Sequence, residues 1–216
     1  MSNSLLLVAL LFLALAHPFL PAESFGHGVF LVAISAVLIT AVWVLSWRRG
    51  VLIAGLALAV PTFITAWVQH FIEFRWLTAM YLVLGALFLG FTAVVVLRQT
   101  LRSATVTADT IAGAVCFYLL LGVIWALIFA LLEIAHPGSF LDGGRAVGSA
   151  GHHSLVPELL YLSLVTLSTL GYGNILPVTP QARMLAALEG IIGPLYLAVL
   201  IAQLVGLAAS RPRPGA

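Results

Sequence analysis

Long apolar stretches separated by short polar breaks dominate this sequence of 216 residues. A helix that spans a bilayer needs about 20 mostly apolar residues. Six stretches reach or approach that length: Ser4–Leu20, Gly28–Trp47, Val51–His70, Trp76–Leu97, Thr110–Ile134 and Gln181–Ala209. Only 7% of the residues are charged, against about 25% in a soluble domain. The sequence therefore predicts an all-α membrane protein with six transmembrane helices, in contact with membrane lipids.

The first stretch, within Met1 to Pro21, is as hydrophobic as a secretory signal peptide but lacks the positively charged start of one. We expect a retained first helix, with a cleaved signal as the alternative. The arginines near the other stretch ends indicate the orientation. With both termini in the cytoplasm, six arginines lie inside and three outside. We expect a multi-pass protein of the cell membrane, and the absence of lysine suggests a bacterial inner membrane.

A different pattern follows residue 134. The segment Ala135 to Leu155 is rich in glycine and polar residues and is typical of a solvent-exposed loop. The apolar run after it, Val156 to Ser168, is too short to span. Such a run fits a re-entrant helix, which is tolerated where protein shields it or where it lines water.

The sequence Thr166-Leu-Ser-Thr-Leu-Gly-Tyr-Gly173 directly follows the short run. It resembles the potassium-channel signature T-x-x-T-x-G-Y-G. Glycine accepts the backbone angles that turn successive carbonyls to one side, and Gly171 and Gly173 stand where those angles are needed. The resemblance implies an extended selectivity filter of Thr169, Leu170, Gly171, Tyr172 and Gly173. It also implies a homotetramer, because one strand cannot surround an ion.

The same resemblance implies that K⁺ ions, bound at Thr169, Leu170, Gly171 and Tyr172, are the only cofactors. It divides the chain into a four-helix domain (1–107), a pore domain (108–210) and a short cytoplasmic tail (211–216). Within the pore domain we expect a pore helix at 156–168 and the filter at 169–173. Pro157 suits the first turn of that helix, and Glu158 complements its N-terminal dipole.

Later in the chain, Gly193 stands twenty residues after Gly173, where relatives place the hinge of the inner helix. Pro194 follows, and a proline favours a bend because it removes a helix hydrogen bond.

Around the filter the chain departs from the family pattern. Asn174 replaces the usual acidic residue, and Tyr161 and Leu162 replace a tryptophan pair of the pore helix. These positions support the filter in relatives, so the replacements predict a more labile filter. Thr166, Ser168 and Glu189 are further candidates for filter support. Glu133 and Glu189 interrupt apolar segments and either brace the pore region or are protonated or interfacial groups without such a role.

The stretch Trp76–Leu97, fourth along the chain, contains no arginine. A voltage sensor needs several such charges within its helix, so we expect weak or no voltage gating. Only Ser210 to Ala216 follow the last stretch, which predicts no soluble ligand-binding domain. Apolar residues at helical spacing near the C-terminus form a candidate hydrophobic gate, although they could equally face lipid or other helices: Leu197, Ile201, Leu204 and Leu207.

Five histidines fall on the expected outer side: His27, His70, His136, His152 and His153. They are consistent with ordinary loop residues, with a proton sensor or with a metal site. The main prediction is a potassium-selective channel and no enzyme. The alternatives are a less selective cation channel, a membrane-embedded metalloenzyme that uses these histidines, and a non-conducting subunit. A net charge of only +2 gives no indication of nucleic-acid binding.

Overall fold

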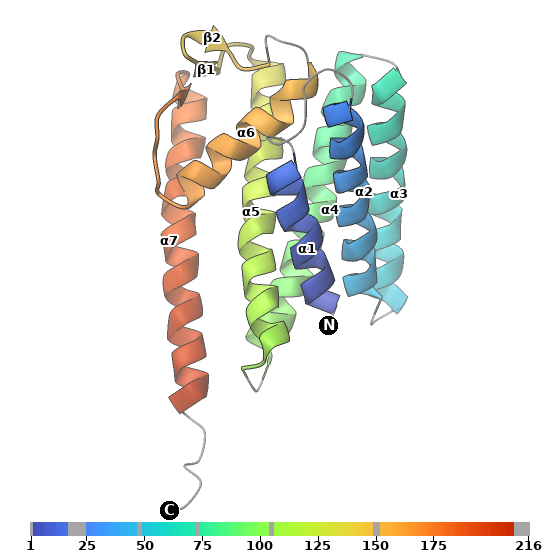
Figure 1. Cartoon of the computed structure of the whole chain (residues 1–216), viewed down its shortest axis with the longest axis vertical. Helices are drawn as coiled ribbons and strands as arrows, with labels where there is room; N and C mark the ends of the chain where they lie inside the picture. The colour runs from blue at the N-terminus through green and yellow to red at the C-terminus, as the bar shows by residue number, and fades with distance from the viewer. Residues whose placement is uncertain are drawn as a thin grey trace, which may run out of the picture.

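The computed structural model describes residues 2–16, 25–46, 49–71, 74–103, 106–148 and 152–209. It is an all-α protein with one small sheet, as the sequence predicts apart from that sheet (Figure 1). Its elements are α1 Ser2–Ala16, α2 Phe25–Leu45, α3 Arg49–Phe71, α4 Arg75–Leu101, α5 Ala108–Ala135, β1 Phe140–Asp142, β2 Arg145–Ala146, α6 His152–Leu167, β3 Ile175–Pro177 and α7 Pro180–Ala209.

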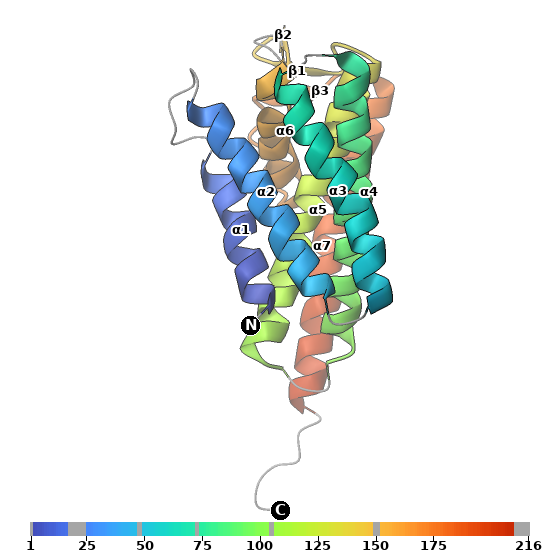
Figure 2. The ribbon, with the colours of Figure 1, turned by 90° about the vertical axis from the view of Figure 1, so that its right-hand side faces the viewer.

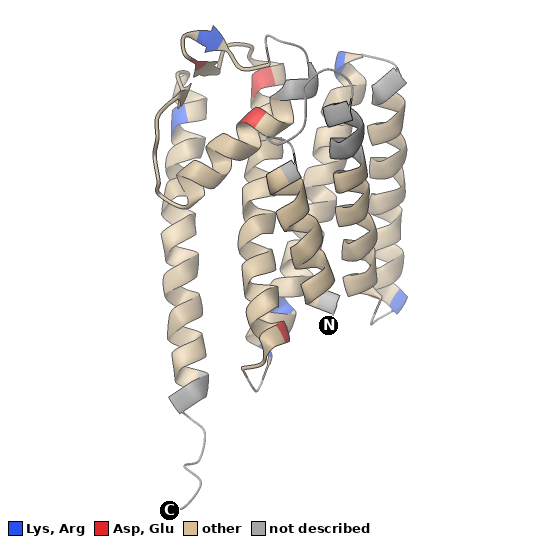
Figure 3. Ribbon diagram, viewed as in Figure 1, with Lys and Arg blue, Asp and Glu red and all other residues tan. Residues whose placement is uncertain are grey.

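Four of the described helices, α3, α4, α5 and α7, are long and apolar enough to cross a membrane. The first two predicted spans fall on α1 and α2, whose described apolar parts are shorter, Asn3–Leu15 and Val32–Leu45. Charged positions lie mainly at the two ends of the bundle (Figure 3), which suits a protein whose middle faces hydrocarbon. The chain is therefore a multi-pass membrane protein.

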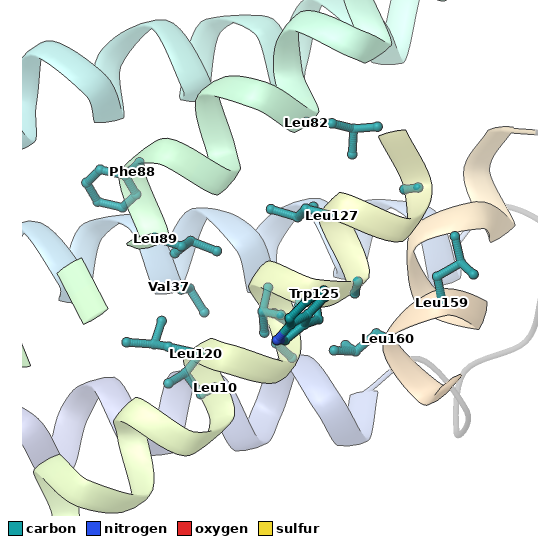
Figure 4. Packing of buried hydrophobic residues seen from close by; sticks show 14 of the residues in the cluster. Leu10, Val37, Leu82, Phe88, Leu89, Leu120, Trp125, Leu127, Leu159 and Leu160 are labelled. Atoms are coloured by element: carbon teal, nitrogen blue, oxygen red, sulfur yellow. The ribbon is translucent and has the colours of Figure 1, made fainter. Parts of the chain in front are cut away.

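Helix α5 is the centre of the packing. The four N-terminal helices lie on one side of it and α7 on the other, and in the turned view α7 lies behind them (Figures 1 and 2). Side chains from α1, α2, α4 and α6 converge on α5 (Figure 4), and Phe88, Leu120 and Phe129 are completely buried. Helices α1 and α4 thus pack on α5 of the same chain.

Helix α6 crosses obliquely between α5 and α7 and does not span the molecule (Figure 1). Its contact with α5 is close, since a Cβ added to Gly122 would lie 2.9 Å from a Leu164 methyl group. The helix begins at His152, four residues before the predicted start. Pro157 is therefore inside the helix, and Glu158 is not in its first turn. Our prediction for these two residues was wrong because the helix extends through the residues before Val156 back to His152. The Glu158 carboxylate instead accepts the N–H of Gly148 at 3.3 Å.

A three-stranded antiparallel sheet in the order β2-β1-β3 lies at the end of the bundle where α5 ends. Strands β1 and β2 fall in the segment that the sequence predicted to be a solvent-exposed loop. Leu141 pairs with Ala146 in β2 and with Leu176 in β3. The Glu133 carboxylate at the end of α5 accepts the N–H groups of Gly138 at 2.6 Å and Phe140 at 2.9 Å. Glu133 therefore holds the turn that leads into this sheet with both of its carboxylate oxygens.

Candidate functional site

The end of α6 sets the course of the segment 169–173. The N–H of Thr169 donates to the Thr166 carbonyl at 3.0 Å, and the N–H of Leu170 donates to the Val165 carbonyl at 2.9 Å. This pair of bonds is the Schellman motif that ends many helices. Its left-handed position is usually glycine, but here Thr169 occupies it with φ 58°. A non-glycine residue in this region costs about 1–3 kcal/mol, so the surrounding contacts must hold the threonine there.

Left-handed backbone recurs at every second residue of the segment. Thr169, Gly171 and Gly173 have φ of 58°, 64° and 79°, while Leu170 and Tyr172 do not have positive φ. Alternation of this kind turns successive carbonyls toward one side of the strand. A Cβ on Gly171 would meet nothing within 4 Å, so its φ, and not crowding, is what requires glycine.

Two of the residues that the sequence predicts to support the filter, Tyr161 and Asn174, form a hydrogen bond with each other. Tyr161 Oη on α6 donates to Asn174 Oδ1 at 3.0 Å, which connects α6 to the residue after the two glycines. Ser168 instead donates to the Leu164 carbonyl of its own helix at 2.7 Å. Leu162 is buried in the core. The replacement of the family residues at 161 and 174 thus leaves a direct bond between these two positions.

Behind α6, Glu189 of α7 is fully buried against Ser163. The Ser163 hydroxyl is within hydrogen-bond distance of Glu189 Oε1, and also of the Gly122 carbonyl on α5 at 2.7 Å. Ser163 therefore links α5, α6 and α7. Sequence inspection missed Ser163 and Gly122, although a serine within an apolar re-entrant run is a signal that could have drawn attention to the first.

Helix α7 meets the end of α6 at Gly193. A Cβ built there would overlap the Leu167 carbonyl oxygen, so only glycine permits this approach of two backbones. Tyr118 of α5 donates to the same carbonyl at 3.0 Å. The predicted hinge residue Pro194 lies within α7, which continues through it as one helix. Packing therefore explains Gly193 without a hinge.

Farther along α7, the side chains proposed as a gate have few neighbours in the single chain. Leu197 and Ile201 are exposed, Leu204 is half-buried, and the side chain of Leu207 is outside the described residues. The structure thus places three of the four on an open part of the helix.

Of the five outer histidines, only the side chain of His136 is described, and it is exposed. His27, His70, His152 and His153 lie outside the described side chains. Within the described part of the chain no three His, Cys, Asp or Glu residues are grouped as a metal site would need.

Comparison with known proteins shows that part of the chain is similar to ion channels. A model described as "Ion channel" matches residues 115–209. The chain is 34% identical over 85 residues to two pore potassium channel c of Oryza sativa subsp. japonica, which covers 38% of this chain and 19% of the relative. It is 32% identical over 102 residues to the inward rectifier potassium channel Kirbac3.1 of Paramagnetospirillum magnetotacticum. This match covers 45% of this chain and 29% of the relative. Protein LctB of Bacillus caldotenax is 29% identical over 126 residues. This match covers 55% of this chain and 92% of the relative.

The chain thus spans less than a third of the length of the first two relatives, and no solved structure matches it significantly. The matched residues include the alternating backbone, the helix before it and α7. Over this segment the chain is similar to ion channels, and two of the relatives named above are potassium channels.

Proposed function

We propose that the protein is a potassium-selective channel that passes K⁺ passively across the cell membrane. The observation that carries this proposal is the alternation of positive φ at Thr169, Gly171 and Gly173. Backbone carbonyls aligned in this way can replace the hydration shell of K⁺. The carbonyls of Thr169, Leu170, Gly171 and Tyr172, with the Thr169 hydroxyl at the inner end, would hold the ions.

One strand provides only one side of such a site, so the proposal requires a homotetramer around a central axis. Two observations support it. The filter side chains Leu170 and Tyr172 are 54% and 69% exposed in the single chain. Only 11% of the spanning part of α7 is buried, against 44% for both α4 and α5. Copies of the chain would cover both surfaces.

The proposed arrangement makes α5, α6 and α7 the pore domain and α1 to α4 a peripheral domain. The C-terminal end of α6 carries partial negative charge from its unpaired carbonyls, which would stabilise a cation in the inner cavity. Exposed Leu197 and Ile201 would face that cavity as an apolar constriction.

Orientation and gating follow from the arginines. Arg98 lies in the last turn of α4 and Arg102 at its C-cap. Both are then anchors at the cytoplasmic surface, on the same side as the two termini. Because the described part of α4 has no arginine between its first residue and Arg98, we propose weak or no voltage gating.

Reversal potentials in planar bilayers with mixed K⁺ and Na⁺ test the selectivity. A value near the K⁺ equilibrium potential supports the proposal, and a value near zero indicates the less selective cation channel. Cross-linking of the purified protein tests the assembly, for which the proposal requires bands that stop at the tetramer.

A further inference from the structure

A cavity of about 540 Å³ opens at the end of the bundle opposite the sheet. It lies where α4 ends and α5 begins, with α1 and the α2–α3 end as further walls. One part of its lining is apolar and consists of Leu45, Val51 and Val95, while the other part is polar. A mixed lining of this kind suits a molecule that is both apolar and polar, such as a lipid, better than a small inorganic ion.

The polar part carries a positive charge. Arg98 and Arg102 both line the cavity, and Asp109 is the acidic residue among the described lining residues. Two arginines against one aspartate leave one net positive charge. Asp109 is already engaged, because Asn3 Nδ2 donates to its Oδ2 at 3.3 Å and to its carbonyl at 3.2 Å. A basic pocket between helices at the cytoplasmic side is suited to an anionic lipid headgroup.

Two buried polar groups lining the cavity have no partner within the described structure. Thr100 Oγ1 and Asn3 Oδ1 make no hydrogen bond, although each residue is only 5% exposed. An unpaired buried polar group costs about 1–3 kcal/mol, so a ligand that satisfies both would bind favourably. The hydroxyl can donate to a phosphate oxygen, whereas the amide oxygen needs a donor such as a headgroup hydroxyl.

Gly113 of α5 leaves space for the side chains of Thr100 and Asn3. A Cβ at that position would lie 2.7 Å from Thr100 Oγ1 and 2.9 Å from Asn3 Nδ2. The side chains of Thr100 and Asn3 therefore occupy space that a side chain at residue 113 would fill.

We infer that this cavity binds the headgroup of an anionic phospholipid that carries a free hydroxyl, such as phosphatidylglycerol. Arg98 and Arg102 pair with the phosphate, Thr100 donates to it, and Asn3 Oδ1 accepts from the headgroup hydroxyl. The adjacent Leu101 carbonyl accepts a hydrogen bond from Gln203 Nε2 of α7 at 3.0 Å. Binding itself does not depend on the proposed conduction.

Lipid titration of the full chain, purified in a neutral detergent, tests this inference. Native mass spectrometry counts how many lipid molecules the protein retains when it is titrated with dioleoyl-phosphatidylglycerol, phosphatidic acid or phosphatidylcholine. A separate experiment adds inorganic phosphate as a competitor. The double variant Arg98→Gln/Arg102→Gln removes both cavity charges. Arg49→Gln is the matched control, because Arg49 is an exposed arginine at the same end that does not line the cavity.

We expect phosphatidylglycerol to bind more tightly than both other lipids, and the double variant to weaken it about thirtyfold, since each surface arginine contributes about 1 kcal/mol. Arg49→Gln should change binding by less than about twofold. Thr100→Val, which nearly keeps the side-chain shape, should weaken phosphatidylglycerol and phosphatidic acid alike. Equal losses for Arg49→Gln and the double variant would overturn the inference, as would displacement of the lipid by millimolar phosphate or equal retention of phosphatidylcholine.

Discussion

The Tyr161 hydroxyl on α6 donates to Asn174 Oδ1, 3.0 Å away, and so connects α6 to the residue that follows Gly171 and Gly173. Tyr161→Phe removes this bond and little else. A net hydrogen bond contributes about 1 kcal/mol, so we expect mean open times about fivefold shorter in single-channel recordings. Asn174→Asp keeps an acceptor for the tyrosine and strengthens it with charge, so this variant should have open times at least as long as the parent. Unchanged open times in Tyr161→Phe would show that the bond does not stabilise the filter.

Gly193→Ala tests the close approach of α7 to the end of α6. The added methyl group would overlap the Leu167 carbonyl, and overpacking of this kind typically costs about 1–3 kcal/mol. We expect a lower melting temperature in detergent together with reduced K⁺ flux. Gly206→Ala is the matched control on the same helix, since a Cβ there meets nothing within 4 Å. If Gly193→Ala altered flux without any loss of thermal stability, a hinge would explain the glycine better than packing does.

The hydrogen bonds around Ser163 predict the protonation state of the Glu189 carboxyl, because the serine hydroxyl has only one proton to donate. A hydroxyl has one proton, yet Ser163 Oγ contacts both the Gly122 carbonyl and Glu189 Oε1. Both bonds form together when the Glu189 carboxyl is protonated and donates to the serine. A glutamine can donate in the same way, so Glu189→Gln should keep the melting temperature and the flux.

The contrasting variant is Glu189→Leu, which leaves Ser163 without that partner. We expect it to destabilise the protein by about 1–3 kcal/mol, measured as a fall in melting temperature. Comparable destabilisation by Glu189→Gln would indicate that the ionised carboxylate is required and would contradict the proton count.

Sequence patterns predicted the parts of this fold that depend on hydrophobicity and on glycine. The apolar stretches gave the helices, and the family motif gave the position of the short helix before residue 169. Contacts between segments far apart in the chain were not predictable in the same way. Glu133 was a candidate either to brace the pore region or to be a protonated or interfacial group, and it binds the turn at Gly138 and Phe140 that leads into the three-stranded sheet. Pro157 was expected in a first turn, but α6 begins five residues earlier.

In the candidate site, too, some features follow from the local sequence and others depend on contacts between distant segments. Gly171 and Gly173 follow from the backbone angles that a motif of this kind requires. The threonine at the left-handed helix end, the Ser163 link and the demand for glycine at residue 193 depend on how three helices meet. No local pattern encodes these contacts.

The position of Arg98 and Arg102 at the inner end of α4 predicts a channel that responds little to voltage. Moving one charge across 100 mV changes the energy by about 2.3 kcal/mol, and neither arginine lies within the middle of the span. Open probability in a planar bilayer should therefore vary by less than about threefold between −100 and +100 mV. A steep sigmoidal conductance–voltage curve would show that charge moves through the field after all.

Potassium flux into liposomes that contain only this protein tests the central proposal most directly. We predict uptake of K⁺ that Ba²⁺ blocks, that Na⁺ does not replace, and that Gly173→Ala abolishes, because alanine disfavours the φ of 79° at that position. Equal uptake of Na⁺ and K⁺, or no uptake by correctly assembled protein, would contradict the account of Thr169 to Gly173 as a potassium filter.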